Sequence, residues 1–299
     1  MAVKFSFQIS KALKESITIP VGRNISIRGR NGKAVILIHG LTGTPNEMRF
    51  LASRLNRGGF SISCPRLANH DRPLNVLKNT PWQDFYATVR QAYFKAREHS
   101  DTIFVGGLSM GALLALLLAD EFPQAISGVS CLSPTLFYDG WNCPWYRCFL
   151  PALYWSQLHR VVFFQESPPY GIKNAAVRQK AHEYFTKINA DDTSDIDRFG
   201  YPYFPVSLLR QMELLVKHLR TRLPRITTPV QVIQAKDDDM TSVKNGQFIY
   251  DHVASRQKEL VILENSYHII TADQERGTVL EKMQQFFEHI VPHLEPAHA

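Results

Sequence analysis

Apolar residues along the chain follow two different spacings. Short unbroken runs, such as 34–38 and 128–132, are typical of strands that are buried on both faces of a sheet. Longer segments lie between them, and there apolar residues return every three or four positions, as Phe85 and Val89 do within 82–99. Such a period is typical of amphipathic helices. The alternation of the two patterns predicts βαβ units, and hence a parallel sheet with helices on both faces.

The same pattern locates the individual elements. Short alternating segments at 17–19 and 25–27 suit edge strands. We expect buried strands at 34–38, 60–64, 102–108, 128–132, 229–235 and 260–263. We expect helices at 46–57, 82–99, 110–120, 206–223, 242–253 and 276–290.

The alternation stops near Thr135 and resumes near residue 206. The intervening segment is rich in aromatic residues and proline and has no clear strand pattern. We therefore expect a mainly helical cap at 135–205, inserted into a core of 1–134 and 206–299. Its aromatic residues either form a small core within the cap or line an apolar substrate cleft. On the second interpretation, the candidate substrate-binding residues are Trp141, Trp145 and Trp155.

Composition and charge limit the classes of protein to which the chain can belong. The 299 residues are 44% hydrophobic and 20% charged, which suits a globular protein with an ample core, and the net charge is +7. Basic residues are scattered and are densest over 210–225, either as a solvated helix face or as a surface for anionic lipid. No nucleic-acid-binding motif accompanies them.

Location and assembly are only partly constrained by the sequence. Residues 1–20 lack the apolar core of a signal peptide, and no stretch has about 18 uninterrupted apolar residues. We therefore expect a cytoplasmic protein, with peripheral membrane contact left open. The oligomeric state is not determined.

The four cysteines point to no metal centre. Cys64 and Cys131 lie in expected strands and suit buried apolar positions. Cys143 and Cys148 are too few for a zinc site, although a disulfide between them stays open. We expect no metal ion and no organic cofactor.

One serine lies where a strand is expected to turn into a helix. Gly107 and Gly111 flank Ser109 in a Gly-x-Ser-x-Gly motif. Such a turn forces the serine into a strained backbone conformation and lifts its hydroxyl above the sheet. It also places the serine at a helix N-terminus, where free N–H groups favour developing negative charge. Ser109 is therefore the candidate nucleophile.

A serine nucleophile needs a base, and the base needs an orienting carboxylate. Three aspartates at 237–239 follow the strand at 229–235, and His268 follows the last strand. The chain order of serine, acid and histidine is the one found in α/β-hydrolases. His268 is the candidate base, and spacing leaves the choice among the three aspartates open.

The oxyanion of an acyl-transfer intermediate needs preorganised donors. We expect one from the backbone N–H of Met110, directly after the nucleophile. The second donor is the N–H of Leu41, in the loop after the strand at 34–38. His39 and Gly40 are expected to shape that loop rather than to transfer protons.

These motifs resemble the α/β-hydrolase superfamily, in particular its small bacterial carboxylesterases and monoacylglycerol lipase-like enzymes. The matching segments are 39–43, 107–111, 234–240 and 266–271, and the similarity covers about 34–132 and 206–291. The resemblance implies the α/β-hydrolase fold, a catalytic triad and ester hydrolysis. Relatives place the acid in a Gln-Ala-basic-x-Asp pattern, which selects Asp238.

The chain departs from these relatives in one loop. Many relatives have Gly-His-Gly where this chain has Asn69-His70-Asp71. We expect a changed loop that does not touch the triad.

The expected function is hydrolysis of carboxylic esters with an apolar acyl chain, on a small-molecule ester or lipid, through an acyl-enzyme on Ser109. Thioesterase, lysophospholipase, amidase or acyltransferase activity would use the same triad, because a fold does not fix a substrate. A hydrolase-fold protein that binds without turnover is a further alternative, although the three triad positions are all filled.

Overall fold

A seven-stranded sheet forms the centre of the computed structural model, which describes residues 24–186 and 200–290. The strand order is β1-β3-β2-β4-β5-β8-β9, and only β1 runs antiparallel to its neighbour. The mostly parallel sheet predicted from the sequence is therefore confirmed, while the strand expected at 17–19 lies outside the described residues. The strands are β1 (Ile25–Ile27), β2 (Lys33–Ile38), β3 (Ser61–Cys64), β4 (Thr102–Leu108), β5 (Gly128–Leu132), β8 (Val230–Ala235) and β9 (Lys258–Leu263).

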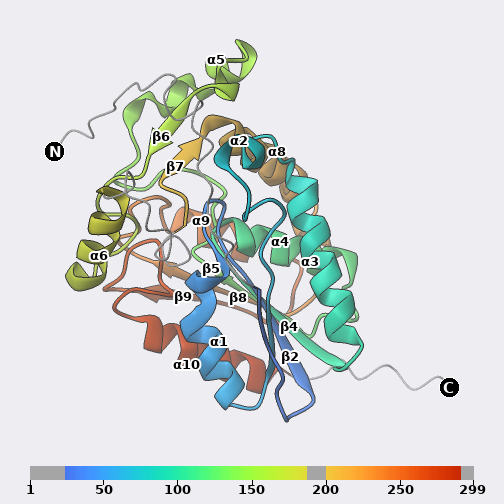
Figure 1. Ribbon diagram of the computed structural model, residues 1–299. Coiled ribbons are helices and arrows are strands. Elements are labelled where there is room, and N and C mark those ends of the chain that lie inside the picture. The colour runs from blue at the N-terminus through green and yellow to red at the C-terminus, as the bar shows by residue number, and fades with distance from the viewer. Residues whose placement is uncertain (1–23, 187–199, 291–299) are drawn as a thin grey trace.

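Helices cover both faces of this sheet (Figure 1). Helices α1 and α10 pack with one another on one face, and α3, α4, α8 and α9 build the larger core on the other. These helices are α1 (Arg49–Arg57), α3 (Trp82–Arg97), α4 (Met110–Glu121), α8 (Val206–Arg220), α9 (Lys244–His252) and α10 (Arg276–His289). A single-turn η1 (Pro45–Met48) precedes α1, a short α2 (Leu74–Leu77) precedes α3, and η5 (Leu223–Arg225) follows α8.

Helix α4 lies deepest in the molecule. Its residues 110–119 are all buried, because it packs on β4 and β5 below and on α3 and α8 outside. A helix that is apolar all round is buried on every side, as this one is. The N-terminus of α4 is therefore held firmly at the carboxyl edge of the sheet, directly after Ser109.

The cap region between β5 and α8 lies above that edge (Figure 1). It contains η2 (Trp145–Phe149), α5 (Leu150–Trp155), η3 (Leu158–Arg160), β6 (Phe163–Gln165), α6 (Ala175–Thr186) and β7 (Tyr203–Pro205). Strands β6 and β7 pair antiparallel, so the expectation of no strand in this region was wrong. Strands of three residues are too short to produce a recognisable period in the sequence.

Hydrogen bonds connect the cap to the loops of the core. The backbone N–H of Tyr201 donates to the carbonyl of Thr42 at 2.9 Å. Gly200 has a φ of 83°, and a Cβ there would lie 2.4 Å from the same carbonyl oxygen, so only glycine fits this close approach. The N–H of Gly171 donates to the Asp239 carboxylate at 3.1 Å.

In the part of the chain that the structure describes, no helix is long and apolar enough to cross a membrane.

Candidate active site

Ser109 occupies the sharp turn between β4 and α4. Its φ of 57° and ψ of −116° lie in a region that side chains rarely adopt. A Cβ on Gly107 would lie 2.1 Å from the carbonyl oxygen of Gly111, and a Cβ on Gly111 would lie 2.2 Å from that of Ile38. Both glycines are therefore required by the close packing of strand, turn and helix. The turn is stabilised by the neighbouring strand β5, because the N–H of Ser109 donates to the carbonyl oxygen of Leu132 at 2.8 Å.

Asp238 and His268 come together from the loops after β8 and β9. The Nδ1 of His268 lies 2.9 Å from Oδ2 and 3.1 Å from Oδ1 of Asp238. Both side chains are almost completely buried. An imidazole whose Nδ1–H donates to a carboxylate presents Nε2 as the basic nitrogen.

The Asp238 carboxylate is surrounded by donors. Oδ2 accepts from Gln234 Nε2 at 2.8 Å and from the Thr241 hydroxyl at 2.9 Å. Oδ1 accepts from the N–H groups of Met240 and Thr241 at 2.9 and 2.8 Å. These bonds hold the carboxylate in one orientation, and they offset the loss of hydration on burial.

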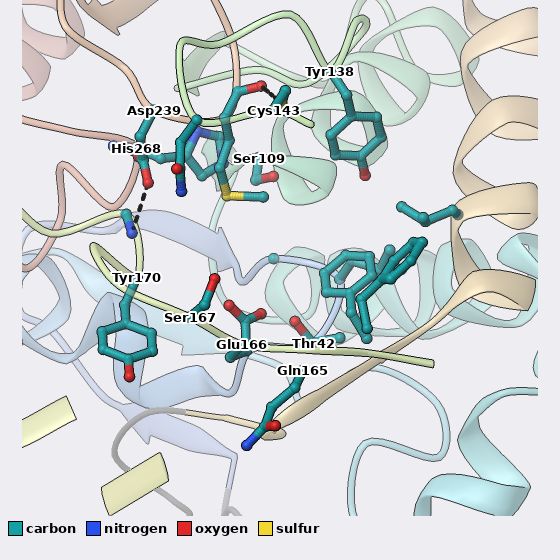
Figure 2. A pocket seen from close by; sticks show the side chains of 18 of the residues that line it. Thr42, Ser109, Tyr138, Cys143, Gln165, Glu166, Ser167, Tyr170, Asp239 and His268 are labelled. Atoms are coloured by element: carbon teal, nitrogen blue, oxygen red, sulfur yellow. Dashed lines mark hydrogen bonds between the residues drawn. The ribbon is translucent and has the colours of Figure 1, made fainter. Parts of the chain in front are cut away.

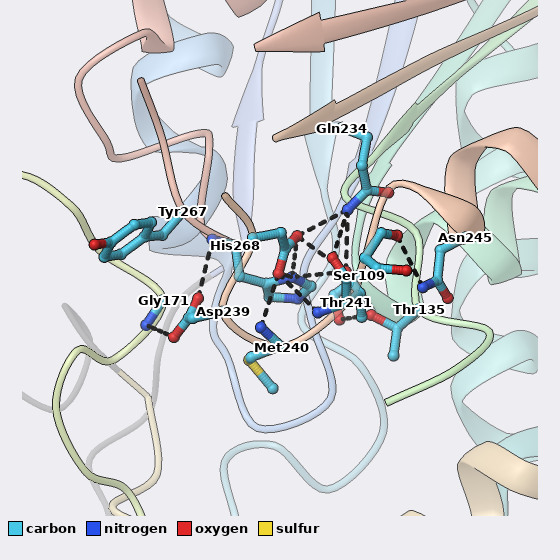
Figure 3. Close-up of polar contacts among 12 residues, drawn as sticks. Ser109, Thr135, Gly171, Gln234, Asp239, Met240, Thr241, Asn245, Tyr267 and His268 are labelled. Atoms are coloured by element: carbon cyan, nitrogen blue, oxygen red, sulfur yellow. Dashed lines mark hydrogen bonds and ion pairs between the residues drawn. The ribbon is translucent and has the colours of Figure 1, made fainter. Parts of the chain in front are cut away.

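The two aspartates next to Asp238 lie in different environments, and Figure 3 shows that of Asp239. Asp237 is exposed and forms a salt bridge with Lys173 at 3.0 Å. Asp239 is buried and accepts from the N–H of His268 at 3.3 Å and from the N–H of Gly171. Burial and the nearby Asp238 raise the pKa of Asp239 to about 6. Of the three, only Asp238 reaches the imidazole of His268 with its side chain.

The Ser109 hydroxyl lies beside the imidazole of His268 in both close-up views (Figures 2 and 3). In this conformation it shares a 2.9 Å hydrogen bond with the hydroxyl of Thr135. His268 Nε2 is buried and has no hydrogen-bond partner within residues 24–186 and 200–290. The serine, histidine and aspartate predicted from the sequence are therefore brought together, with the basic nitrogen free to accept a proton.

Charges near His268 set its basicity. Burial, the largest single effect, would by itself lower the pKa of His268, but the charge and hydrogen bond of Asp238 together with the charges of Asp239 and Glu47 outweigh it. The pKa of His268 is consequently raised above its ordinary value. A more basic imidazole is a stronger proton acceptor, provided that the pH is high enough to keep it neutral.

The expected oxyanion donors also lie at this edge of the sheet. Met110 is the first residue of α4, so its N–H has no carbonyl partner one helical turn earlier. Leu41 lies in the loop after β2, and both Leu41 and Ser109 border the same cleft. His39 Nδ1 contacts the carbonyl of Gly40 at 2.8 Å, as expected of a residue that shapes the loop.

The changed loop at 69–71 contacts this region after all. His70 is buried, and its Nε2 lies 2.7 Å from the carbonyl oxygen of Leu41. The loop therefore leaves the triad untouched, as expected, but it contacts the residue expected to supply an oxyanion donor. Burial lowers the pKa of His70, so this imidazole stays neutral and donates to the carbonyl.

A cleft of about 610 Å³ opens between the core and the cap above Ser109 and His268 (Figure 2). Most of its wall is apolar and belongs to the cap and to α8. The apolar lining includes Phe149, Leu150, Leu153, Val162, Phe164, Phe204 and Leu209. A cleft of this size and character suits a small molecule with a hydrocarbon segment.

Part of the cleft lining is polar. Glu47, Glu166 and Asp239 border it together with Thr42 and Ser167. Burial raises the pKa of Glu47 and that of Glu166 to about 7. In Figure 2, the Glu166, Ser167 and Thr42 side chains lie close to one another. The cleft beside Ser109 therefore has both an apolar compartment and a polar compartment at Glu166, Ser167 and Thr42.

The three tryptophans expected to bind substrate do not line the cleft. Trp141, Trp145 and Trp155 are 59%, 76% and 88% exposed. Trp141 is held by a hydrogen bond from Nε1 to the carbonyl of Asp237. Aromatic composition had identified the correct segment, but phenylalanines and leucines of that segment form the wall instead.

Neither a metal centre nor a disulfide is formed by the described residues. They contain no group of three His, Cys, Asp or Glu side chains arranged to hold a metal ion. Cys143 and Cys148 are both free, and the thiol of Cys143 contacts the carbonyl of Met240 at 3.2 Å. Cys64 and Cys131 are buried, as expected.

Several residues of the site had no recognised sequence signal. Thr135, Gln234 and Thr241 reach the triad from the ends of β5 and β8, and any residue after a parallel strand is a candidate for such a position. Glu47 did have a signal, because Thr44-x-x-Glu47 has the spacing of a helix capping box.

The sheet, the strained serine turn and the aspartate–histidine pair define a serine hydrolase of the α/β-hydrolase fold. The chain belongs to the serine aminopeptidase S33 family, whose sequence profile matches residues 29–275. Within this fold it is an enzyme of the carboxylesterase and lipase type.

Known relatives agree with this assignment. A thermostable monoacylglycerol lipase of Bacillus sp. strain H-257 is 28% identical over 254 residues, which cover 85% of this chain and 89% of the relative. A carboxylesterase of Bacillus subtilis strain 168 is 25% identical over 86% of this chain and 93% of the relative. A solved structure reported with the metagenome-derived lipolytic enzymes LipS and LipT superposes with a TM-score of 0.71 at 27% identity, covering 91% of this chain and 99% of the other.

Proposed function

We propose that the chain hydrolyses carboxylic esters with Ser109 as nucleophile, His268 as general base and Asp238 as the orienting acid. The observation that carries this proposal is the buried Asp238–His268 pair, which leaves Nε2 unpartnered beside Ser109. The backbone N–H groups of Leu41 and Met110 are the proposed oxyanion donors. No step requires a metal ion or an organic cofactor.

In the first half-reaction, the Ser109 hydroxyl turns from Thr135 toward His268 and attacks the ester carbonyl. Its proton passes to Nε2, and Asp238 stabilises the imidazolium that forms. The carbonyl oxygen becomes an oxyanion that accepts from Leu41 and Met110, next to the N-terminus of α4. When the tetrahedral intermediate collapses, His268 protonates the leaving alcohol, and the acyl group stays on Ser109.

In the second half-reaction, water takes the place of the alcohol. His268 removes a proton from the water, which attacks the acyl-enzyme through the same oxyanion geometry. Collapse returns the proton to Ser109 and releases the carboxylic acid. An alcohol in place of water would give acyl transfer, so product analysis separates the two reactions.

For the substrate, we propose an ester that joins an apolar acyl chain to a small hydroxyl-bearing alcohol, such as a monoacylglycerol. The apolar compartment suits the acyl chain, and each buried CH₂ contributes roughly 0.8 kcal/mol. The polar compartment at Glu166, Ser167 and Thr42 offers hydrogen-bond partners for alcohol hydroxyls. The name of the Bacillus sp. relative, a monoacylglycerol lipase, supports this choice.

The test combines labelling with turnover. Wild-type protein is incubated with a fluorophosphonate, and separately with a monoacylglycerol, a phosphatidylcholine-derived lysophospholipid and an acyl thioester. We expect stoichiometric labelling of Ser109, no labelling of Ser109→Ala, and the highest kcat/KM on the monoacylglycerol. Equal labelling of both proteins would contradict the role of Ser109, and faster thioester or lysophospholipid turnover would contradict the substrate.

We also propose that the cap contacts anionic phospholipid surfaces through an aromatic patch. This patch consists of Trp145, Phe149, Trp155, Leu158 and Val161, all of them exposed. The sequence has two arginines and no acidic residue between Asp139 and Glu166, so the charge of this segment complements a negative surface. Phe149 belongs both to the patch and to the lining of the cleft, so lipid at the patch would lie at the cleft mouth.

Vesicle sedimentation tests the membrane contact. Wild type should bind phosphatidylcholine vesicles that contain phosphatidylserine, and Trp145→Ser/Trp155→Ser should bind at least several-fold more weakly. Phe94→Ser, which removes an exposed aromatic ring from α3, is the matched control and should bind like wild type. Equal binding of all three proteins would contradict the proposed contact.

A further inference from the structure

We propose that Glu47 is a positioning residue for the oxyanion hole: its carboxyl group holds Gly40 so that the N–H of Leu41 faces the reacting carbonyl. This inference rests on the proposed function, because Leu41 matters only if Ser109 attacks an acyl group. Glu47 lies on η1, just after the loop at residues 40–43, and it also borders the cleft.

Both backbone groups of Gly40 are held by side chains. Its N–H donates to Glu47 Oε2 at 2.9 Å, and its carbonyl oxygen lies 2.8 Å from His39 Nδ1. The carbonyl of Gly40 and the N–H of Leu41 belong to one planar peptide group and point in opposite directions. Fixing Gly40 at both ends therefore fixes the direction of the Leu41 N–H.

The following carbonyl groups of the loop are bound elsewhere. The Leu41 carbonyl accepts from His70, and the Thr42 carbonyl accepts from the N–H of Tyr201 in the cap. Among these contacts, only the one made by Glu47 restrains the N–H side of Gly40. Without it, a buried N–H would lose its acceptor, and the loop would gain freedom where catalysis needs a rigid donor.

Gly43 provides the space that the Glu47 carboxyl group occupies. A Cβ at position 43 would lie 2.2 Å from both carboxyl oxygens of Glu47. The backbone of Gly43 has no positive φ that would by itself require glycine. The absence of a side chain at this position is thus explained by the carboxyl group behind it.

Charges around Glu47 fit a supporting role. His268 lowers the pKa of Glu47, while Glu47 and Asp239 each raise the pKa of Glu166. Because burial raises the pKa of Glu47 to about 7, part of the protein carries a neutral carboxyl group at neutral pH. A neutral carboxyl group still accepts a hydrogen bond, and it places no full negative charge near the oxyanion.

Two substitutions separate the hydrogen bond from the charge. Glu47→Gln keeps an acceptor for the Gly40 N–H, whereas Glu47→Met keeps the volume and removes the acceptor. For Glu47→Met we expect kcat on a p-nitrophenyl ester to fall about 10- to 100-fold, less than the loss of a whole oxyanion donor, with KM changed less than threefold. Glu47→Gln should retain at least one third of wild-type kcat, and Glu288→Gln, on the exposed side of α10, serves as the surface control.

Inhibition by a trifluoromethyl ketone distinguishes a positioning role of Glu47 from a merely structural one. Its adduct with Ser109 carries an oxyanion, so its inhibition constant should rise in Glu47→Met by the same factor as kcat/KM falls. Glu47→Met with kcat within twofold of wild type would overturn the proposal. Glu47→Gln as slow as Glu47→Met would also overturn it, because charge rather than the hydrogen bond would then be responsible.

Gly43 offers an independent measurement if Glu47→Met does not fold. Gly43→Ala should lower kcat in wild type, because its methyl group displaces the carboxyl group of Glu47. In the Glu47→Ala background the same change should have little further effect, whereas equal effects in both backgrounds would overturn the coupling. Activity retained by Ser109→Ala would instead contradict the proposed function, so the two failures are distinguishable.

Discussion

The carboxyl edge of the sheet and the cap above it differ in how their side chains are held. At the sheet edge, Asp238 is 2% exposed and accepts hydrogen bonds at both carboxylate oxygens. In the cap, Trp155 is 88% exposed, and most of the cleft wall that the cap supplies is apolar. The difference indicates a division of labour. On the proposed function, the core would supply the rigid reacting centre, and the cap would supply the apolar surface that selects the acyl chain.

Removing the base should have the largest effect. We expect His268→Ala to lower kcat for ester hydrolysis by about 10⁴- to 10⁶-fold, because the nucleophile and base act as one unit. Circular dichroism and thermal unfolding should show a retained fold, since His268 contributes a side chain to a loop rather than to a core cluster. If the variant turned over ester within tenfold of the wild-type rate, His268 would not be the general base, and the function proposed for the core would be contradicted.

The aspartates at 237–239 allow a sharper test of the core. Asp238→Asn should lower kcat by about 10⁴-fold, because an amide in this position favours the wrong tautomer of His268. Asp237→Asn removes only a surface salt bridge with Lys173 and should change kcat less than twofold. Steady-state kinetics at one pH distinguish them, and similar losses in both variants would contradict the assignment of Asp238.

Chain-length preference tests the cap. Leu153 lines the cleft from α5, so Leu153→Trp should fill part of the apolar compartment. We expect kcat/KM for a p-nitrophenyl ester of a twelve-carbon acid to fall at least tenfold, on the basis of roughly 0.8 kcal/mol per displaced CH₂, with the acetate ester unchanged. Trp155→Ala should leave the ratio of the two substrates unchanged. A changed ratio would restore Trp155 as a substrate-binding residue.

The smallest expected effect concerns Asp239, whose carboxylate lies between the core and the cap. This carboxylate bonds both His268 and Gly171, and it raises the pKa of His268. Because the base must be neutral, kcat/KM rises with pH through the pKa of His268. Asp239→Asn lowers that pKa and should move the acid limb of the pH profile down by roughly half a pH unit. A profile that moves to higher pH would contradict this account.

Sequence patterns were sufficient to predict the core, because each of its strands and turns is identified by residues within one short segment. The unbroken apolar run before Ser109 predicts a buried strand, and the flanking glycines at 107 and 111 predict the strained turn. Parallel strands then bring the residues after β8 and β9 to the same edge, whatever their separation along the chain. Choosing Asp238 over its two neighbours required a family resemblance, because spacing does not reveal which carboxylate faces the imidazole.

The cap could not be predicted in the same way. Its elements are short, so no period identifies the β6–β7 pair, and composition does not distinguish an inward from an outward aromatic ring. Phe164 and Trp155 have similar character in sequence, yet one lines the cleft and the other is exposed. The side to which each ring faces depends on packing between segments far apart in the chain.

The hydrogen bond from Tyr201 to Thr42 has a consequence for how substrate reaches the serine. It joins a cap segment to the loop that also carries Leu41, and Gly200 lets the two backbones touch. If the cap moved away from the core as a rigid body, this hydrogen bond would displace the loop and the N–H of Leu41 with it. On the proposed function, an acyl chain would then enter along the exposed edge of the cleft, where Phe149 lies, with the cap still bonded to the core.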